Sequence, residues 1–157
     1  MAGRGASEVH VLRTRLRAAF ARAKTLEGGD PEMVSDFAKY LCVLVSGFVE
    51  TAVGELAVEH CRARSHKTVL SFSTSHLDRI QNLNAEKLTQ FIRSFDSGWA
   101  LRLVEFMEGQ RKDALDSVIG LRNQIAHGQS VGLSLARITQ YFDKVDELVV
   151  FVEKLMK

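Results

Sequence analysis

Proline is almost absent from the sequence, since Pro31 is the only one in 157 residues. Because proline ends or kinks helices, its scarcity favours long helices over a loop-rich β fold. The hydrophobic fraction of 46% and the charged fraction of 25% are those of an average globular protein. A chain of this length buries a sizeable core without disulfides or metals, so we expect one all-α domain.

Cysteine is scarce as well, with only Cys42 and Cys61, and the two do not form a Cys-x-x-Cys pair. No apolar run follows the basic start, so no signal peptide is predicted. The longest uncharged run, residues 40–49, is about half as long as a bilayer crossing needs. We therefore expect a soluble cytoplasmic protein with reduced thiols and no membrane partner.

Several common site motifs are missing. The sequence has no phosphate-binding glycine loop and no nucleophilic-serine elbow. His60, Cys61 and His66 match no zinc spacing, so we predict neither a metal nor another cofactor. The aromatic residues between positions 91 and 106 have helical spacing and are predicted to belong to the core: Phe91, Phe95, Trp99 and Phe106.

The net charge of +2 is too small to indicate nucleic-acid binding by itself, but the first 24 residues are strongly basic. Glu8 is their only acid. Weak contacts with an RNA backbone are predicted for four arginines: Arg13, Arg15, Arg17 and Arg22. A solvated basic helix face explains the same pattern equally well.

Helix signals divide the chain into seven segments. A flexible start is expected for residues 1–7, because they are rich in glycine and alanine. Asp30 with Pro31 and Asn84 mark helix starts, residues 96–98 a turn, and Gly128 a helix end. Gly47 and Gly54 lack bulk, so another helix is expected to approach there. Helices are predicted at 8–26, 31–64, 85–95, 99–107, 110–127 and 135–156, with one helix or two short ones over 69–80, forming an antiparallel bundle with extra helices at its ends.

The helix at 110–127 carries the one segment that points to chemistry. Its apolar stripe is interrupted at Arg122, where a leucine would be expected. A guanidinium on a core-facing stripe is costly unless it is paired or faces a polar cleft. Asn123 and His127 share a helix face, and Arg122 and His127 are about 140° apart on an ideal helix.

The run Arg122-Asn123-Gln124-Ile125-Ala126-His127-Gly128 resembles the R-x4-6-H motif of HEPN domains, in which a polar residue commonly follows the arginine. The apolar run at residues 40–50, which ends in Phe48-Val49-Glu50, is similar to a second helix of that family. The resemblance covers about residues 30–156 and implies a single HEPN-like domain at 8–157. Arg4 and His10 also fit R-x4-6-H, but they lie outside any apolar stripe.

The resemblance implies a homodimer whose two motifs line one cleft, and a metal-independent endoribonuclease of toxin–antitoxin, anti-phage or RNA-processing systems. Arg122, Asn123 and His127 are then the catalytic residues, with Glu50 behind them and RNA as substrate. An antitoxin is a further possible partner. Some family members carry a tyrosine two residues after the motif histidine, where this chain has Gln129, so control through such a tyrosine is not expected.

Other readings of the same residues stay open. The helix dipole favours histidine at a helix C-terminus without any catalysis. Arg122 is alternatively a structural residue paired with Glu50. The domain is then an inactive helical module that binds a partner protein or a nucleotide, or a purely structural helical dimer.

Overall fold

The computed structural model describes residues 3–157, which form seven α-helices and no strand. The predicted all-α fold is confirmed, and most helix bounds differ from the prediction by only a few residues. The helices are α1 (Arg4–Lys24), α2 (Pro31–Arg64), α3 (Lys67–Leu77), α4 (Ala85–Arg93), α5 (Ser97–Met107), α6 (Gln110–Ala126) and α7 (Leu135–Met156).

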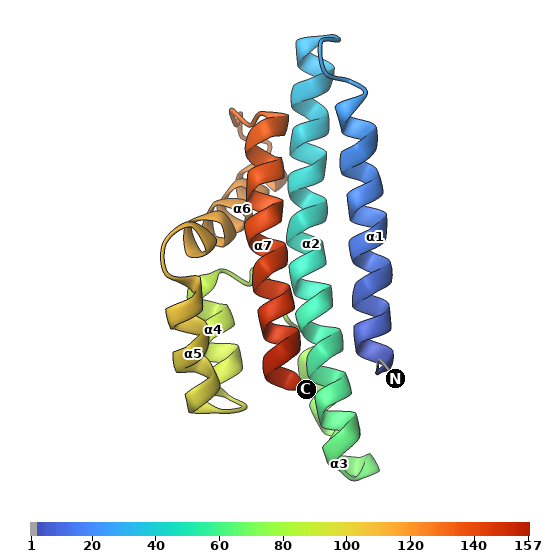
Figure 1. The fold of residues 1–157 in the computed structure, drawn as a ribbon, viewed down its shortest axis with the longest axis vertical. Helices are drawn as coiled ribbons and strands as arrows, with labels where there is room; N and C mark the ends of the chain where they lie inside the picture. The colour runs from blue at the N-terminus through green and yellow to red at the C-terminus, as the bar shows by residue number, and fades with distance from the viewer. Residues whose placement is uncertain (1–2) are drawn as a thin grey trace.

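Helix α2 lies at the centre and packs against α1, α3, α6 and α7 (Figure 1). It begins as predicted, because the Asp30 side chain accepts a hydrogen bond from the N–H of Glu32 at 2.9 Å and Pro31 occupies the first turn. Helix α1 runs antiparallel to α2. Helix α7 runs parallel to α2, so that His60 near the end of α2 contacts the carbonyl of Met156 at the end of α7. The bundle is therefore not antiparallel throughout, because α6 crosses it and returns the chain to the start of α2.

By length and composition alone, α2 is apolar enough to cross a membrane. A helix that is apolar on most sides is also what the centre of a helical bundle requires. In the structure its buried residues face α1, α6 and α7, and they are Ala38, Leu41, Cys42, Val45, Ser46, Phe48, Val49, Ala52, Val53, Leu56 and Ala57. Packing in the core thus accounts for the composition of α2.

The start of α1 differs from the prediction. The helix begins at Arg4, so residues 4–7 are helical and not flexible, while residues 1 and 2 lie outside the described part of the chain. Gly5 is buried, and a Cβ atom there would lie 2.7 Å from the carbonyl oxygen of Glu55. The glycine that suggests flexibility in the sequence serves instead to let the backbones of α1 and α2 approach closely.

A buried carboxylate joins α1 to α7. Asp146 is 7% exposed and binds Arg13 Nε at 2.6 Å and Arg17 Nη2 at 2.9 Å. Two guanidinium partners compensate the desolvation of this carboxylate. The pair of contacts holds α1 against the bundle and restricts what its arginines are able to reach.

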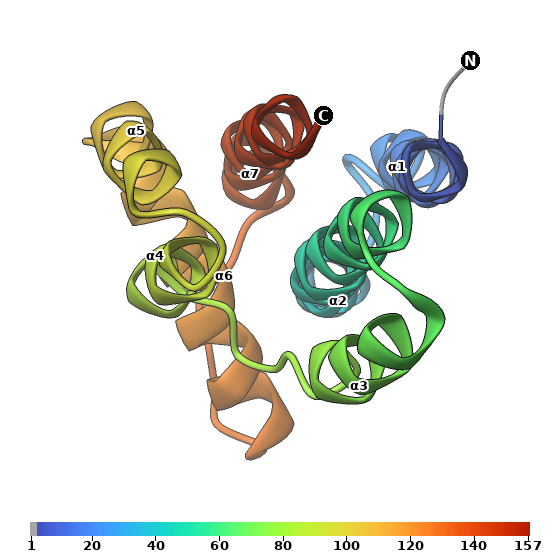
Figure 2. The same ribbon diagram turned by 90° about the horizontal axis from the view of Figure 1, so that it is seen from below.

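Helices α4 and α5 form a hairpin at one side of the bundle (Figure 2). Asn84 caps α4 as predicted, accepting a hydrogen bond from the N–H of Lys87 at 3.0 Å. Asp96, expected in a turn with Ser97 and Gly98, is instead the N-cap of α5 and accepts from the N–H of Trp99 at 2.8 Å. Aspartate is common both in turns and at helix N-caps. Here it is an N-cap because α5 begins at Ser97.

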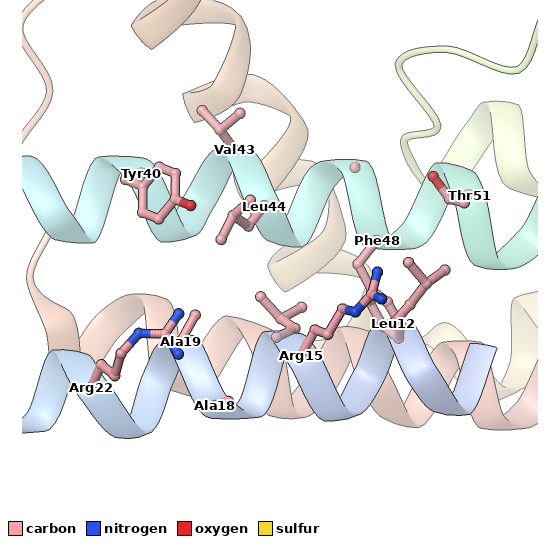
Figure 3. Close-up of a pocket in the computed structure, with 12 residues that line it drawn as sticks. Leu12, Arg15, Ala18, Ala19, Arg22, Tyr40, Val43, Leu44, Phe48 and Thr51 are labelled. Atoms are coloured by element: carbon pink, nitrogen blue, oxygen red, sulfur yellow. The ribbon is translucent and has the colours of Figure 1, made fainter. Parts of the chain in front are cut away.

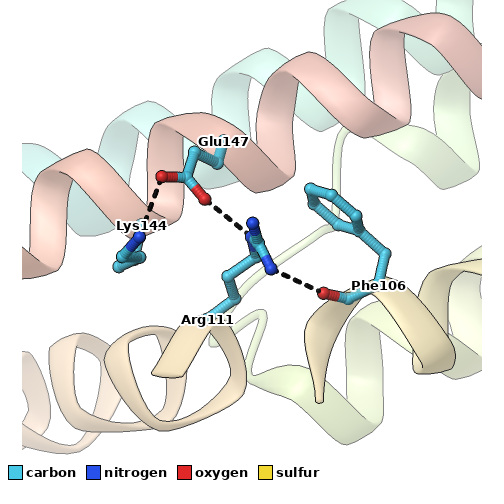
Figure 4. A network of polar contacts seen from close by, with 4 residues as sticks. All are labelled: Phe106, Arg111, Lys144 and Glu147. Carbon is cyan, nitrogen blue, oxygen red and sulfur yellow. Dashed lines mark hydrogen bonds and ion pairs between the residues drawn. The ribbon is translucent and has the colours of Figure 1, made fainter. Parts of the chain in front are cut away.

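Arg111 anchors the start of α6 (Figure 4). Its Nε donates to Glu147 Oε2 of α7 at 2.6 Å, its Nη1 donates to the carbonyl oxygen of Phe106 at 3.3 Å, and its guanidinium lies 4.2 Å from the centre of the Phe106 ring. Lys144 also donates to Glu147, at 3.0 Å. These contacts join α5, α6 and α7 at one corner and direct the far end of α6 across α2.

Hydrogen bonds from Lys144 and Arg111 lower the pKa of Glu147 below its ordinary value of 4.5, despite its partial desolvation. A lowered carboxyl pKa contributes stability above the ordinary value that is lost as the pH falls through the lowered one. We expect Glu147→Gln to have a lower melting temperature than the wild type at pH 7, with the difference shrinking below about pH 4. Thermal melts from pH 7 to pH 3 measure this. Glu105→Gln on the exposed face of α5 is the control, and a difference that is the same at every pH contradicts the prediction.

Candidate active site

Helix α6 ends in a turn closed by Gly128, as predicted. The φ of Gly128 is +70°, in the left-handed region that favours glycine. Its N–H donates to the carbonyl oxygen of Ile125 at 3.1 Å, and the N–H of Gln129 donates to that of Gln124 at 2.9 Å. This pair of hydrogen bonds is a Schellman motif. It holds the backbone of His127, which is the C-cap residue of α6.

The His127 side chain is exposed at this helix end. Its backbone N–H donates to the carbonyl oxygen of Asn123 at 3.1 Å, but within residues 3–157 no hydrogen bond reaches its imidazole ring. Arg122 and His127 lie at the same end of α6, but no hydrogen bond joins their side chains. The imidazole is accessible to a bound molecule.

Arg122 is half-buried one turn earlier, at the edge of the core. Its Nη1 donates to Asn123 Oδ1 at 3.2 Å and to Asn82 Oδ1 at 3.3 Å. Both acceptors are neutral amide oxygens. They orient the guanidinium and leave its charge uncompensated.

The other half-buried arginines show how unusual this is. Only Arg13, Arg111 and Arg122 are half-buried among the arginines of residues 3–157, and the first two bind carboxylates at 2.6 Å. No ion pair joins Arg122 to any carboxylate in this part of the chain. An oriented cation without a counter-charge is suited to hold an anionic ligand.

Asn82 is the site residue that sequence reasoning missed. It lies in the segment between α3 and α4 and has a φ of +53°, a conformation that asparagine tolerates better than most residues. This backbone turns its side-chain oxygen to Arg122 and its N–H to Glu50 Oε1, at 2.7 Å. The available signal was an asparagine in a short linker, where left-handed turns are common.

Glu50 does not pair with Arg122, which corrects the direct ion pair considered from the sequence. Its carboxylate accepts the N–H of Asn82, and Asn82 in turn accepts from Arg122. Glu50 is thus connected to Arg122 only through Asn82, in the segment between α3 and α4.

The basic residues of α1 separate into two groups. Arg13 is turned into the bundle by Asp146, with a side chain only 13% exposed, so it is not a surface contact for RNA. Arg17 binds the same carboxylate but stays 64% exposed. Arg15 and Arg22 extend into a groove between α1 and α2 of about 570 Å³ (Figure 3).

The α2 wall of this groove leads to the site. Tyr40, Val43, Gly47 and Glu50 recur at intervals of three and four residues and therefore share one side of α2. Tyr40 is 51% exposed and Val43 41% exposed, and nothing lies within 4 Å of a Cβ atom built on Gly47. The close approach of a helix expected at Gly47 does not occur within residues 3–157. We call Tyr40, Val43 and Gly47 the α2 stripe.

His60, which the sequence analysis considered as a metal ligand, has a structural role. His60 Nδ1 lies 2.8 Å from the carbonyl oxygen of Met156, and its ring packs against Phe95 and Trp99. Residues 3–157 contain no group of three or more His, Cys, Asp or Glu arranged to hold a metal ion. The His60 ring is thus held by packing and by a backbone carbonyl.

Comparison with known proteins identifies the class. A family model described as RiboL-PSP-HEPN matches residues 13–157, which include Glu50, Asn82 and the whole end of α6. The protein belongs to the HEPN family, whose members are nuclease-like or RNA-related helical modules. No curated protein and no solved structure shows significant similarity to the chain.

Glu50→Ala leaves the N–H of Asn82 without its acceptor. Because an unsatisfied, partly buried donor costs free energy, we expect a loss of about 1–2 kcal/mol in the free energy of unfolding. Glu50→Gln, which keeps an acceptor oxygen, should recover most of the loss. Urea unfolding of both variants measures it, and an unchanged midpoint for Glu50→Ala would refute a positioning role for Glu50.

Proposed function

We propose that the protein is a metal-independent endoribonuclease whose catalytic residues are Arg122, Asn123 and His127. The proposal rests on the Arg122 guanidinium, which two amide oxygens orient and no carboxylate of residues 3–157 neutralises. A phosphodiester supplies the missing negative charge and matches a guanidinium in geometry. Membership of the HEPN family agrees with an activity directed at RNA.

The exposed imidazole of His127 is suited to move protons, because histidine both accepts and donates them near neutral pH. In the proposed reaction it removes the proton of a ribose 2′-hydroxyl. The 2′-oxygen attacks the phosphorus, the bond to the 5′-oxygen breaks, and that oxygen takes a proton from a second imidazole. The products are a 2′,3′-cyclic phosphate and a 5′-hydroxyl. DNA lacks the attacking hydroxyl and is not cut.

Arg122 acts on the phosphate in this scheme. Charge grows on the non-bridging oxygens as the 2′-oxygen attacks, and a pre-oriented guanidinium stabilises that charge without reorganisation in the transition state. Asn123 lies 3.2 Å from the guanidinium and fixes its direction. No step requires a metal ion.

The second imidazole has to come from a second subunit, because each chain carries one motif at the end of α6. We propose a homodimer in which two copies of His127 face one cleft. The α2 stripe supports this arrangement, since it is exposed, largely apolar and continuous along α2 with Glu50. Apolar patches of this kind on a soluble domain commonly mark interfaces.

We place this activity in the cytoplasm, as a toxin of a toxin–antitoxin pair or an anti-phage effector. A second candidate is an inactive module that binds a partner protein or a nucleotide. It is favoured by the lack of a hydrogen bond between His127 and Arg122 and by the groove that Arg15 and Arg22 line. Cleavage assays separate the two.

We expect the purified protein to cleave single-stranded RNA in excess chelator. His127→Ala should lower the rate at least ~100-fold through loss of proton transfer. Arg122→Ala should lower it by about 100- to 1,000-fold through loss of charge stabilisation. Gel analysis of cleavage, with end-group mapping for a cyclic phosphate, measures this.

The matched control is the pair Arg4→Ala and His10→Ala, because those residues on α1 also fit the R-x4-6-H pattern. Both variants should cleave at the wild-type rate. Intact RNA with the wild-type protein, or full activity in His127→Ala, would favour the inactive binding module.

The dimer surface is tested separately. Val43→Asp places a charge on the α2 stripe without entering the core, so it should give monomers with a nearly unchanged melting temperature and abolish cleavage. Light scattering reports the mass. Leu101→Asp is the control, since Leu101 is 70% exposed on α5, and a Val43→Asp variant that remains dimeric would exclude the α2 stripe as the interface.

A further inference from the structure

Helix α3 is held to the molecule more loosely than the other helices. It packs against α2 alone, and none of its residues is fully buried. Phe72, at its middle, is 66% exposed, and Val69 is 53% exposed. Leaving an aromatic ring in water forgoes hydrophobic stabilisation, so its exposure points to a binding role.

A groove of about 510 Å³ separates α3 from α4. Phe72 and Ile80 line it, together with Phe91 of α4 and Phe95, which lies just after the end of α4. Phe91 and Phe95 are only partly covered by the core in which the sequence placed them. His76 lies one turn after Phe72, with ring centres 4.3 Å apart. The groove thus presents aromatic faces of the size of a nucleobase.

The permanent charge that lines this groove is positive. Residues 60–77 contain no aspartate or glutamate and carry five serine or threonine hydroxyls between positions 68 and 75. Arg62 pairs with Glu59, and Arg64 donates to backbone carbonyls at the ends of α2 and α7, so neither belongs to the groove. Arg79 is the only permanently charged residue that lines the groove, and no ion pair joins it to another residue of 3–157. Asp78 faces a separate hollow, with Glu50 and Glu55.

Exposed aromatic rings next to unpaired cations are the features that bind single-stranded nucleic acid, by stacking on bases and by contact with phosphates. A protein partner would find apolar surface here as well, but it would have to supply an acidic group to Arg79. RNA carries both the aromatic and the anionic component in each nucleotide. The composition of the groove therefore favours RNA.

The groove is also connected to the candidate active site. Arg79 at the groove and Asn82 at Arg122 are three residues apart, so their Cα atoms lie within about 11 Å of each other. Helix α3 and the far end of α6 project on the same side of the molecule, away from α7 (Figure 2). A strand whose phosphate lies at Arg122 is able to continue along the α3–α4 segment.

We propose that the α3–α4 groove binds a nucleotide that flanks the cleaved phosphate, with its base stacked on Phe72 and its phosphate at Arg79. This rests on the proposed ribonuclease function. It assigns RNA recognition to α3, a helix to which the sequence pattern drew no attention, in addition to the basic residues of α1.

The test measures binding of a short fluorescein-labelled oligoadenylate by anisotropy, with the full-length His127→Ala protein so that the RNA stays intact. Adding Phe72→Ala should weaken binding about 5- to 100-fold, as expected for loss of one base–aromatic stack. Phe72→Trp should retain the affinity. Arg79→Ala should weaken binding and reduce the slope of log affinity against log salt by about one.

Leu101→Ala is the matched control, as an equally exposed apolar residue on α5. Circular dichroism melts check that each variant folds, and Arg79→Ala provides an independent variant if Phe72→Ala does not. If neither Phe72→Ala nor Arg79→Ala changes the RNA affinity, the proposal is wrong. A groove that binds a protein and not RNA would give this result. If wild-type protein cleaves RNA and Phe72→Ala cleaves it with the same KM, the groove assignment fails while the ribonuclease stands. If Phe72-dependent binding occurs without cleavage, the ribonuclease fails and the groove assignment stands.

Discussion

Helix α2 has apolar side chains on most sides of its 34 residues. Such a helix is stable in water only when several other helices pack around it. Helices α1, α6 and α7 cover the greater part, and α3 covers part of its second half. The side that carries Tyr40, Val43 and Gly47 is left exposed. This uncovered side leads along α2 to Glu50, so the same constraint that builds the core also places a surface suited to a second subunit beside the candidate active site.

The candidate site depends on a cation that the fold orients without neutralising. Elsewhere the chain follows the usual rule, as where Arg13 with Asp146 and Arg111 with Glu147 pair charges at 2.6 Å. Around Arg122 the carboxylate of Glu50 is directed to a backbone N–H, and only amide oxygens contact the guanidinium. An arrangement that withholds a counter-ion is unfavourable for stability and favourable for binding a phosphate.

The structure shows that the basic residues available to a ligand are not those that the sequence makes most obvious. The arginines of α1 form the most obvious cluster in the sequence, yet Asp146 holds Arg13 and binds Arg17. The residues around α3 form a less dense cluster, but no acid interrupts residues 60–77 and Phe72 stands exposed among them. Ion pairing across helices decides which cations remain available, and no pattern along one helix reveals it.

Local patterns in the sequence were sufficient for the helices and their ends. The cap at Asp30, the cap at Asn84 and the turn at Gly128 depend on neighbouring residues only, and Arg122 was visible as an interruption of an apolar stripe. The tertiary structure alone decided that Gly5 lies against α2, that α7 runs parallel to α2, and that Asn82 joins Glu50 to Arg122. These features depend on contacts between residues up to about a hundred positions apart, which arise from how whole helices pack and leave no periodic trace in either segment.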